Sequence, residues 1–283
     1  MKILTRALAT FLLFANLAVF AQDDADTSKT TVEKIESQLK LKFQKGPGVG
    51  NLGGAAEIKI PEGFVFLEAK DTQTLLEAME NPTGGDELGF IAPASLDWFV
   101  VFEFDDSGYV KDDEKGNLDA DKMLESMKRG NKEGNKERKR RGWAELNLIG
   151  WEIKPAYNDQ THNLEWAIKC ESAGKMVINH NTRVLGRKGV MEVTLVAGPE
   201  ELAPNLPKFR EVLTGFDYKS GNKYAEYRQG DKIAEYGLTA LVVGGASAVA
   251  LKSGAFKGLW KLIVLAIAGI GGLLGKLFGR KSE

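Results

Sequence analysis

Few side chains in this sequence are suited to nucleophilic or metal chemistry. The chain has two histidines, His162 and His180, and a single cysteine, Cys170. These three residues lack the paired spacing of a zinc site, although Cys170 and His180 would form a nucleophile pair if neighbouring strands brought them together. Cys170 falls on the apolar face of a predicted strand, where a buried, unreactive thiol is the usual outcome. We therefore assign no catalytic residue and favour a protein that is not an enzyme.

Two other stretches resemble ligand-binding motifs without meeting their requirements. GVGNLG, from Gly48 to Gly53, has the glycine spacing of a dinucleotide-binding turn, which needs a strand before it and a helix after it. The predicted order here is the reverse, so the stretch is interpreted as a flexible turn. Seven acidic residues lie between Asp105 and Asp121, but their spacing does not fit an EF-hand calcium loop. No cofactor and no metal ion is predicted.

The run KRGNKEGNKERKRRG, from Lys128 to Gly142, has eight basic residues, two acidic ones and no apolar one. It is predicted to continue a helix capped by Asp119, with bases at the C-terminal end, where the helix dipole favours them. Asn131, Gly134 and Arg138 share one face of that helix, which we expect to pack on a sheet or a partner. The acidic loop before it could neutralise the run. No nucleic-acid partner is predicted, because the whole chain is nearly neutral, with 38 basic and 39 acidic residues.

The elements that would hold these residues are mostly strands. LEWAIKC alternates apolar and polar residues from Leu164 to Cys170, and MVINHNTRVL and VMEVTLVA follow after the turns SAGK and GRKG. This pattern predicts an antiparallel meander with one half-solvated face. WFVVFEF is apolar on both faces, which is typical of a strand central in its sheet. Strands grouped before and after a helix indicate an α+β fold, with antiparallel sheets and covering helices.

The N-terminus has the three parts of a secretory signal peptide over residues 1–21: a positive start with Lys2 and Arg6, an apolar stretch and small residues at a cleavage site. Residues 22–30 are predicted to be a flexible leader, and residues 31–232 an extracytoplasmic domain. Cleavage would remove two bases and no acid, leaving 36 basic and 39 acidic residues. With a single cysteine, the chain forms no internal disulfide, so an exported domain would depend on its hydrophobic core.

Two charge-free stretches near the C-terminus predict a membrane anchor over residues 233–279, before a basic tail at residues 280–283. They run from Tyr236 to Leu251 and from Leu262 to Gly275. Each is shorter than the ~20 apolar residues that span a bilayer, so one extended span and a two-helix hairpin both stay open. Small residues at four-residue spacing would let anchor helices pack closely or self-associate. These residues are Ala240, Gly244, Ala248, Gly271, Gly275 and Gly279.

Three stretches of the domain carry a resemblance to a known family. GYVKDD at residues 108–113, GW with a later P and Y at residues 150–157, and NTRVLGR at residues 181–187 resemble a bacterial family of predicted membrane-anchored proteins of unknown function, an uncharacterised DUF family. The resemblance covers most of the mature chain. It implies an exported domain held at the membrane, with no accepted activity and no catalytic residues to transfer. The motifs supply candidates for a polar site: Tyr109, Asp112, Asp113, Asn135, Arg138, Trp151, Tyr157, Asn181 and Arg183.

We therefore expect an envelope protein of the bacterial inner membrane, with its domain on the periplasmic side, that binds or scaffolds a partner without catalysis. The expected partners are the lipid bilayer and another membrane or envelope protein. One alternative is an envelope hydrolase or transferase with a polar site near His180 and Asn181 beside the acidic loop. A second alternative is a sensor of anionic lipids that uses the basic helix at residues 128–141.

Overall fold

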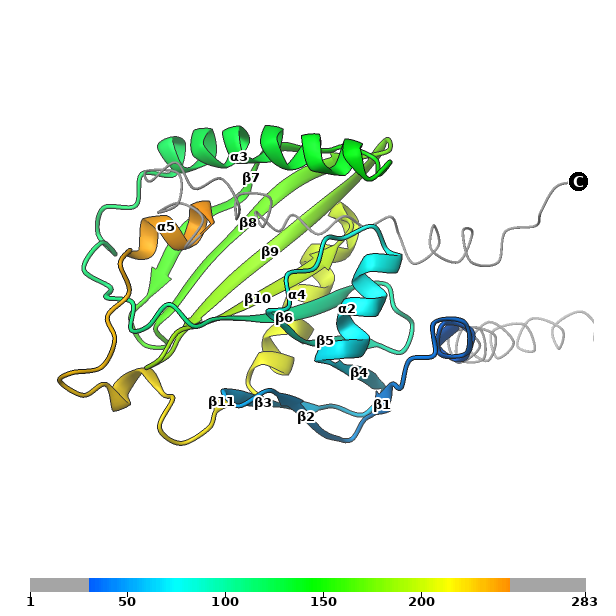
Figure 1. Ribbon diagram of the computed structural model, residues 1–283, viewed down its shortest axis with the longest axis horizontal. Coiled ribbons are helices and arrows are strands. Elements are labelled where there is room, and N and C mark those ends of the chain that lie inside the picture. Colours follow the sequence, from blue (N-terminus) through cyan, green and yellow to red (C-terminus); the bar gives the residue numbers. More distant parts are fainter. Residues whose placement is uncertain (1–30, 245–283) are drawn as a thin grey trace, which may run out of the picture.

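The computed structural model describes residues 31–244, which form a large antiparallel sheet, a small sheet and several helices (Figure 1). The strands of the large sheet lie in the order β1-β4-β5-β6-β10-β9-β8-β7. Antiparallel pairing of β7, β8, β9 and β10 confirms the predicted meander, and β6 is central, as WFVVFEF predicts. The α+β fold is therefore confirmed. The bounds are β1 (Gln44–Lys45), β4 (Phe64–Glu68), β5 (Glu87–Pro93), β6 (Phe99–Asp105), β7 (Leu146–Asn158), β8 (Asn163–Ser172), β9 (Lys175–Leu185) and β10 (Val190–Ala197).

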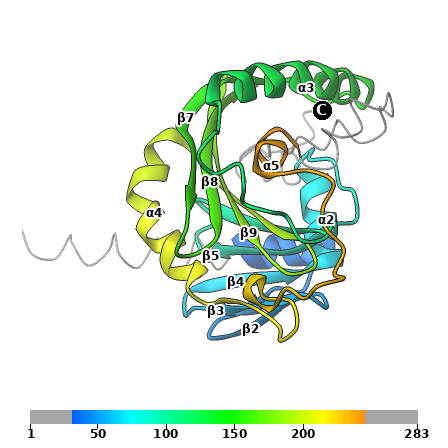
Figure 2. The same cartoon turned by 90° about the vertical axis from the view of Figure 1, so that its left-hand side faces the viewer.

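Helices cover both faces of the large sheet and enclose two hydrophobic cores (Figure 2). The first core lies under a helix at residues 31–39, α2 (Ala69–Ala78), α3 (Ala120–Arg140) and α5 (Leu238–Val243). The second core lies under α4 (Pro199–Leu213) and the small sheet, whose order is β11-β3-β2. The small sheet consists of β2 (Gly48–Leu52), β3 (Ala56–Ile60) and β11 (Phe216–Tyr218).

The alternation of side chains along β8 explains how one strand serves both cores. Leu164 and Trp166 are buried in the first core, whereas Ala167 is buried in the second. Successive side chains of a strand point to opposite faces of the sheet. The alternating pattern in the sequence therefore indicates which residues of β8 face the first core. The other face of β8 was expected to be half solvated, but α4 covers part of it.

The helix α3 is continuous through the basic run, although this run would form a poor helix in isolation. Its first turn is capped as predicted, because Asp119 Oδ1 accepts a hydrogen bond from the backbone N of Lys122 at 3.1 Å. Met123 and Met127 bury their side chains in the first core. Beyond Met127 the helix has no apolar residue to bury, so its order depends on polar contacts with β7.

Two asparagines of α3 hold the helix against the edge strand β7. Asn135 donates from Nδ2 to the carbonyl O of Leu146 at 3.0 Å and accepts at Oδ1 from the backbone N of Leu146 at 2.9 Å. Asn131 donates to the same carbonyl at 2.7 Å and accepts from the backbone N of Leu148 at 3.0 Å. The two amides therefore take the place of a neighbouring strand. This is what the Asn131–Gly134–Arg138 face packs on, so the predicted contact with a sheet is confirmed.

The chain after β11 returns across the domain as a strap, which we define as residues 219–243. Arg187 donates from Nε and Nη2 to the two carboxylate oxygens of Asp231, at 2.7 Å each. Tyr109 is bound on both sides of its peptide unit, since its N donates to Lys232 O at 2.8 Å and its O accepts from Ala234 N at 2.9 Å. The strap ends in α5, where Leu238, Leu241, Val242 and Val243 are buried.

Within residues 31–244, no helix is both long and apolar enough to cross a membrane. The signal peptide, the leader, the basic tail and most of the anchor were predicted in segments outside the described residues. Residues 233–244, the first part of the predicted anchor, are described and pack against the domain, with Ala240 in α5 and Gly244 directly after it. The other small residues of the predicted anchor lie outside the described residues: Ala248, Gly271, Gly275 and Gly279.

Replacing Asn135 tests the contact between α3 and β7. The substitution Asn135→Ala removes three hydrogen-bonding contacts and leaves the N–H of Leu146 without its partner. We expect the free energy of unfolding to fall by ~1–3 kcal/mol, measured by urea denaturation. Lys132→Ala, at an exposed position of the same helix, should change it by less than ~0.5 kcal/mol. Equal stability of the two variants would contradict this role of Asn135.

Candidate functional site

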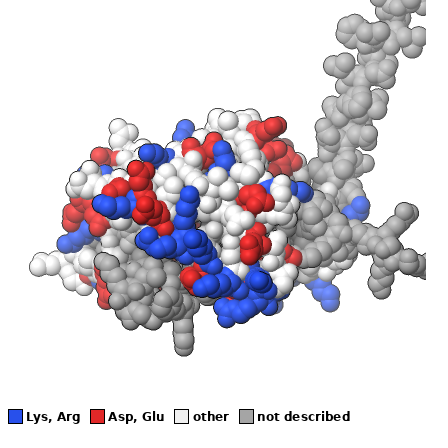
Figure 3. All heavy atoms as spheres, turned by 90° about the horizontal axis from the view of Figure 1, so that it is seen from above, with Lys and Arg blue, Asp and Glu red and all other residues white. Residues whose placement is uncertain are grey.

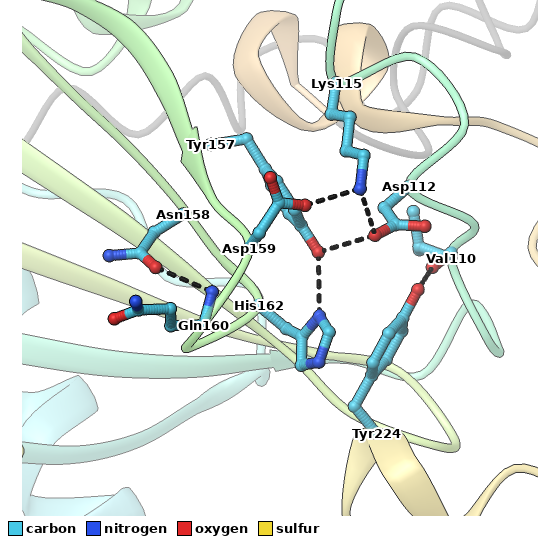
Figure 4. Close-up of polar contacts among 9 residues, drawn as sticks. All are labelled: Val110, Asp112, Lys115, Tyr157, Asn158, Asp159, Gln160, His162 and Tyr224. Carbon is cyan, nitrogen blue, oxygen red and sulfur yellow. Dashed lines mark hydrogen bonds and ion pairs between the residues drawn. The ribbon is translucent and has the colours of Figure 1, made fainter.

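A polar cluster forms where the hairpin between β7 and β8 meets the loop after β6 (Figure 4). Tyr157, near the end of β7, donates from Oη to Asp112 Oδ2 at 3.0 Å. The same Oη lies 3.1 Å from Nδ1 of His162, which occupies the hairpin turn with a φ of 53°. A phenol has one proton, and an ionised carboxylate can only accept. Tyr157 therefore accepts from His162, which assigns the proton of the imidazole to Nδ1.

Aromatic rings of the strap close the other side of this cluster. The ring of Tyr224 stacks on Tyr109 with centroids 4.5 Å apart and lies 4.7 Å from the ring of His162. Tyr227 contacts Tyr109 at 4.4 Å. Tyr224 also donates from Oη to the carbonyl O of Val110 at 3.1 Å. The cluster thus joins a hairpin, a loop and the strap, which are far apart in the sequence.

Burial favours the neutral form of two phenols in this cluster, those of Tyr157 and Tyr224. Burial and the hydrogen bond to Asp112 raise the pKa of Tyr157 well above its usual value. Burial, together with the neighbouring Tyr109, also raises the pKa of Tyr224. Lys115 binds Asp159 and lies 3.9 Å from Asp112, so the carboxylates next to the phenols have a cation nearby. The cluster is a set of satisfied donors and acceptors that fastens the β7–β8 hairpin to the strap.

Three other predicted site residues hold α3 in place. Asn135 binds the β7 edge, and Trp151 donates from Nε1 to the carbonyl O of Ala120 at 3.1 Å, at the start of α3. Arg138 donates from Nε to the carbonyl O of Ala144 at 2.6 Å. Burial lowers the pKa of Arg138. These side chains fix the two ends of α3 relative to β7, so their role is structural.

Asn181 and Arg183 belong to a third group, on the sheet face that the first core covers. Arg183 contacts Glu192 of β10 through Nη2 at 2.9 Å, and its guanidinium lies 4.8 Å from the ring centre of Trp166. Glu192 is paired in register with Glu103 of β6, which is buried. Burial raises the pKa of Glu103 well above its usual value, and the neighbouring carboxylate of Glu192 raises it further. Asn181 accepts a hydrogen bond from Thr194 at 3.3 Å.

The predicted site residues therefore lie in three separate groups and do not form one polar site. The alternative of a site near His180 and Asn181 is not assembled, because these neighbours in β9 face opposite sides of the sheet. His180 packs on Phe209 of α4 with centroids 5.5 Å apart, whereas Asn181 binds Thr194 on the other face. Cys170 faces the first core, so a Cys170–His180 pair does not form either.

The acidic loop does not neutralise the basic run of α3, contrary to the expectation from sequence. Asp112 binds Tyr157, and Glu114 accepts from the backbone N of Thr239 in the strap at 2.8 Å. Asp121 lies 3.8 Å from Lys154 of β7. Asp113 is exposed, and no bond of its side chain is found within the described residues. The loop acids are thus used to fasten the loop to the hairpin and the strap.

A pocket that the sequence did not predict opens on the α4 side of the same hairpin. We call it the hairpin pocket; its volume is about 870 Å³. One wall is the β7–β8 hairpin with the following positions of β8, and the other is the C-terminal end of α4. Its lining includes Tyr157, Asn163, Glu165, Arg210 and Thr214. The polar hairpin YNDQTHN is visible in the sequence, but nothing there places α4 beside it.

A model of the family described as "Protein of unknown function (DUF2167)" matches residues 44–275, which is most of the chain. The chain belongs to this family. The predicted membership of an uncharacterised DUF family is therefore confirmed. No match was found among curated proteins.

Three solved structures show a limited likeness to this DUF2167 member. PsbP from the cyanobacterium Synechocystis matches at 10% identity and a TM-score of 0.35, over 62% of this chain and 94% of its own. The Ran-binding protein Mog1p of Saccharomyces cerevisiae matches at 8% and 0.31, over 66% and 100%. A Pseudomonas aeruginosa protein of unknown function matches at 12% and 0.25, over 59% and 92%. At these scores the likeness says nothing of what the DUF2167 member binds.

Titration of His180 tests the environment of the face that α4 covers. Burial, and next the charge of Arg210, lower the pKa of His180 from its ordinary 6.5 to about 4. Between these values the unfolded chain binds a proton that the folded protein resists, so stability must fall as pH falls through this range. We expect NMR to show His180 titrating near pH 4.

A variant that lacks the imidazole tests this pH effect. In His180→Gln, the loss of unfolding free energy between about pH 6.5 and pH 4 should be smaller than in the wild type. A pKa for His180 at or above its ordinary value would show that this imidazole is not desolvated.

Proposed function

We propose that this protein is an envelope protein of the bacterial inner membrane whose domain lies on the periplasmic side and binds a partner without catalysing a reaction. The predicted signal peptide and the charge-free stretches Tyr236–Leu251 and Leu262–Gly275 support the location. The observation that carries the proposal furthest is the strap. It ties the chain to the domain as far as the first of these stretches, because Tyr236 and α5 pack on the first core.

The contacts of the strap make this connection rigid. Asp231 is held by two hydrogen bonds from Arg187, Tyr236 binds Asp105 through its hydroxyl, and α5 is buried in the first core. An anchor that follows such a strap would hold the domain in one orientation, whereas a flexible linker would let it tumble. A fixed orientation suits a module that presents one surface to a partner in or near the bilayer. The bilayer itself, another envelope protein and a second copy bound through the anchor are the proposed partners.

Fractionation of cells that express the full-length chain tests this proposal. We expect the protein in the membrane fraction after washing with high salt and with alkaline carbonate, with the domain open to protease from the periplasmic side. A chain that ends at Gly244, which keeps the strap, should be released as a soluble periplasmic protein. Reporter fusions after Leu251 and after Glu283 would count the spans. A full-length chain that stays in the cytoplasm would refute the proposed location.

The basic face of α3 favours a second candidate function, the recognition of anionic lipids. Between Lys128 and Arg141, seven basic residues are exposed, and the same stretch contains two acids, Glu133 and Glu137. Figure 3 shows basic side chains gathered on the α3 side of the molecule. The loop acids bind elsewhere and leave this charge in place. The helix that carries these bases also contacts α5, at the start of the C-terminal region. The exposed bases are Lys128, Arg129, Lys132, Lys136, Lys139, Arg140 and Arg141.

Vesicle binding by the full-length protein tests this second candidate. We expect a preference for phosphatidylglycerol over phosphatidylcholine vesicles that weakens as salt is raised. Charge reversal of Lys128, Lys132 and Lys139 to Glu should reduce the preference by about a hundredfold or more, at ~1 kcal/mol per base. The same reversal at Lys70, Lys175 and Lys188, which are exposed on other elements, is the control. An equal effect of both triple variants would indicate a response to net charge alone.

A further inference from the structure

The lining of the hairpin pocket includes one buried polar atom without a partner within residues 31–244, Asn163 Oδ1, and two more, of Thr182 and His180, lie on the neighbouring strand outside the lining. Asn163 and Glu165 of β8 lie in register opposite Val184 and Thr182 of β9, on the face that α4 covers. Asn163 Oδ1, Thr182 Oγ1 and His180 Nδ1 are each buried without a hydrogen bond. A buried polar atom without a partner costs ~1–3 kcal/mol. Asn163, which lines the pocket, therefore marks a place where a polar molecule would be favourable.

The lining of the pocket contains three charged residues, of which Asp159 is paired with Lys115, which leaves Glu165 and Arg210, of opposite sign. Glu165 lies on β8, and Arg210 lies in the last turn of α4. In the part of the chain that the structure describes, neither side chain forms an ion pair with a charged partner. His180 Nε2 is 4.0 Å from Glu165, but burial and Arg210 lower the pKa of His180 to about 4. The imidazole is therefore uncharged at neutral pH and does not neutralise Glu165.

These charges select among ligand classes. A simple anion would be attracted by Arg210 and repelled by Glu165, and a simple cation would meet the reverse. A neutral sugar would leave both charges without a counterion. A molecule that carries an ammonium and a carboxylate satisfies both, and its amide groups can bind Asn163 in the lining.

We infer that the hairpin pocket binds a short zwitterionic peptide, with its ammonium group at Glu165 and its carboxylate at Arg210. The pocket volume of about 870 Å³ lies in the range of ligand pockets, ~300–1,000 Å³, and is larger than a single amino acid needs. The inference rests on the proposed function, since it names the class of partner for the binding module. It does not depend on the side of the membrane on which the domain lies.

The test is a ligand-observed NMR titration of the full-length protein with trialanine. N-acetyl-trialanine and trialanine amide each lack one charge and serve as matched probes. We expect trialanine to bind at least about tenfold more tightly than either capped peptide, as the loss of one charged contact implies. Alanine and dialanine complete a length series and separate a free amino acid from a peptide.

Two variants should each lose a different one of these preferences. Glu165→Gln should remove the preference for a free ammonium and keep that for a free carboxylate, whereas Arg210→Gln should do the converse. Lys208→Gln and Glu200→Gln, exposed on the same helix α4, are the controls and should bind like the wild type. Crossed loss is a result that general damage to the fold cannot produce.

Three results with trialanine and its capped forms would overturn the inference. They are no binding of trialanine by the wild type at 10 mM, equal binding of the capped peptides, and equal loss for all three peptides in each variant. Alanine binding as tightly as trialanine would refute the peptide as the ligand. The fractionation experiment has no peptide readout, so failure of the membrane location and failure of this ligand assignment remain distinguishable.

Discussion

The free edge of the large sheet is the constraint on which most of this structure depends. An edge strand presents unpaired N–H and C=O groups that must bind water, another chain or a covering element. In β7 the amides of Asn131 and Asn135 bind Leu146 and Leu148, and Trp151 binds the first turn of α3. Once α3 is fixed along β7, the β7–β8 hairpin has a defined position. The phenol cluster and the hairpin pocket both lie on that hairpin.

The polar residues of α3 therefore have a structural role, because they hold the helix on β7. A helix with the glycines and repelling bases of this run gains little from its own sequence. Its stability comes from tertiary contacts at Met123, Met127, Asn131 and Asn135, on one side of the helix. The opposite side is then free to carry the exposed bases. One helix thus both closes the sheet and presents a charged surface.

Part of this fold could be predicted from the sequence because it depends on local patterns. The alternation in β8, the Asp119 cap and the contact of the Asn131 face with a sheet need no information beyond their own segments. The grouping of site residues could not be predicted in this way. Tyr157 meets Asp112, 45 residues away, and Arg187 meets Asp231, 44 residues away, and such pairings follow from the order of strands.

Strand periodicity also explains the main error about the site. The alternative site combined His180 with Asn181, but Asn181 and Arg183 share one face of β9 while His180 and Thr182 lie on the other. The hairpin pocket depends on this second face and on α4, which comes later in the chain. Glu103 can be noticed in the sequence, because it is a charged residue within the apolar strand WFVVFEF. Its register with Glu192 and Arg183 appeared only with the strand order.

The position of α5 has a consequence for how the chain is made. Its four buried side chains complete a core whose other members lie between Val32 and Val196. A ribosome must therefore synthesise the chain past Val243 before this core can close. Until then the apolar face of the sheet is exposed, and exposed apolar surface is what chaperones bind and what drives aggregation. The nascent domain therefore cannot reach its final state until synthesis has passed Val243.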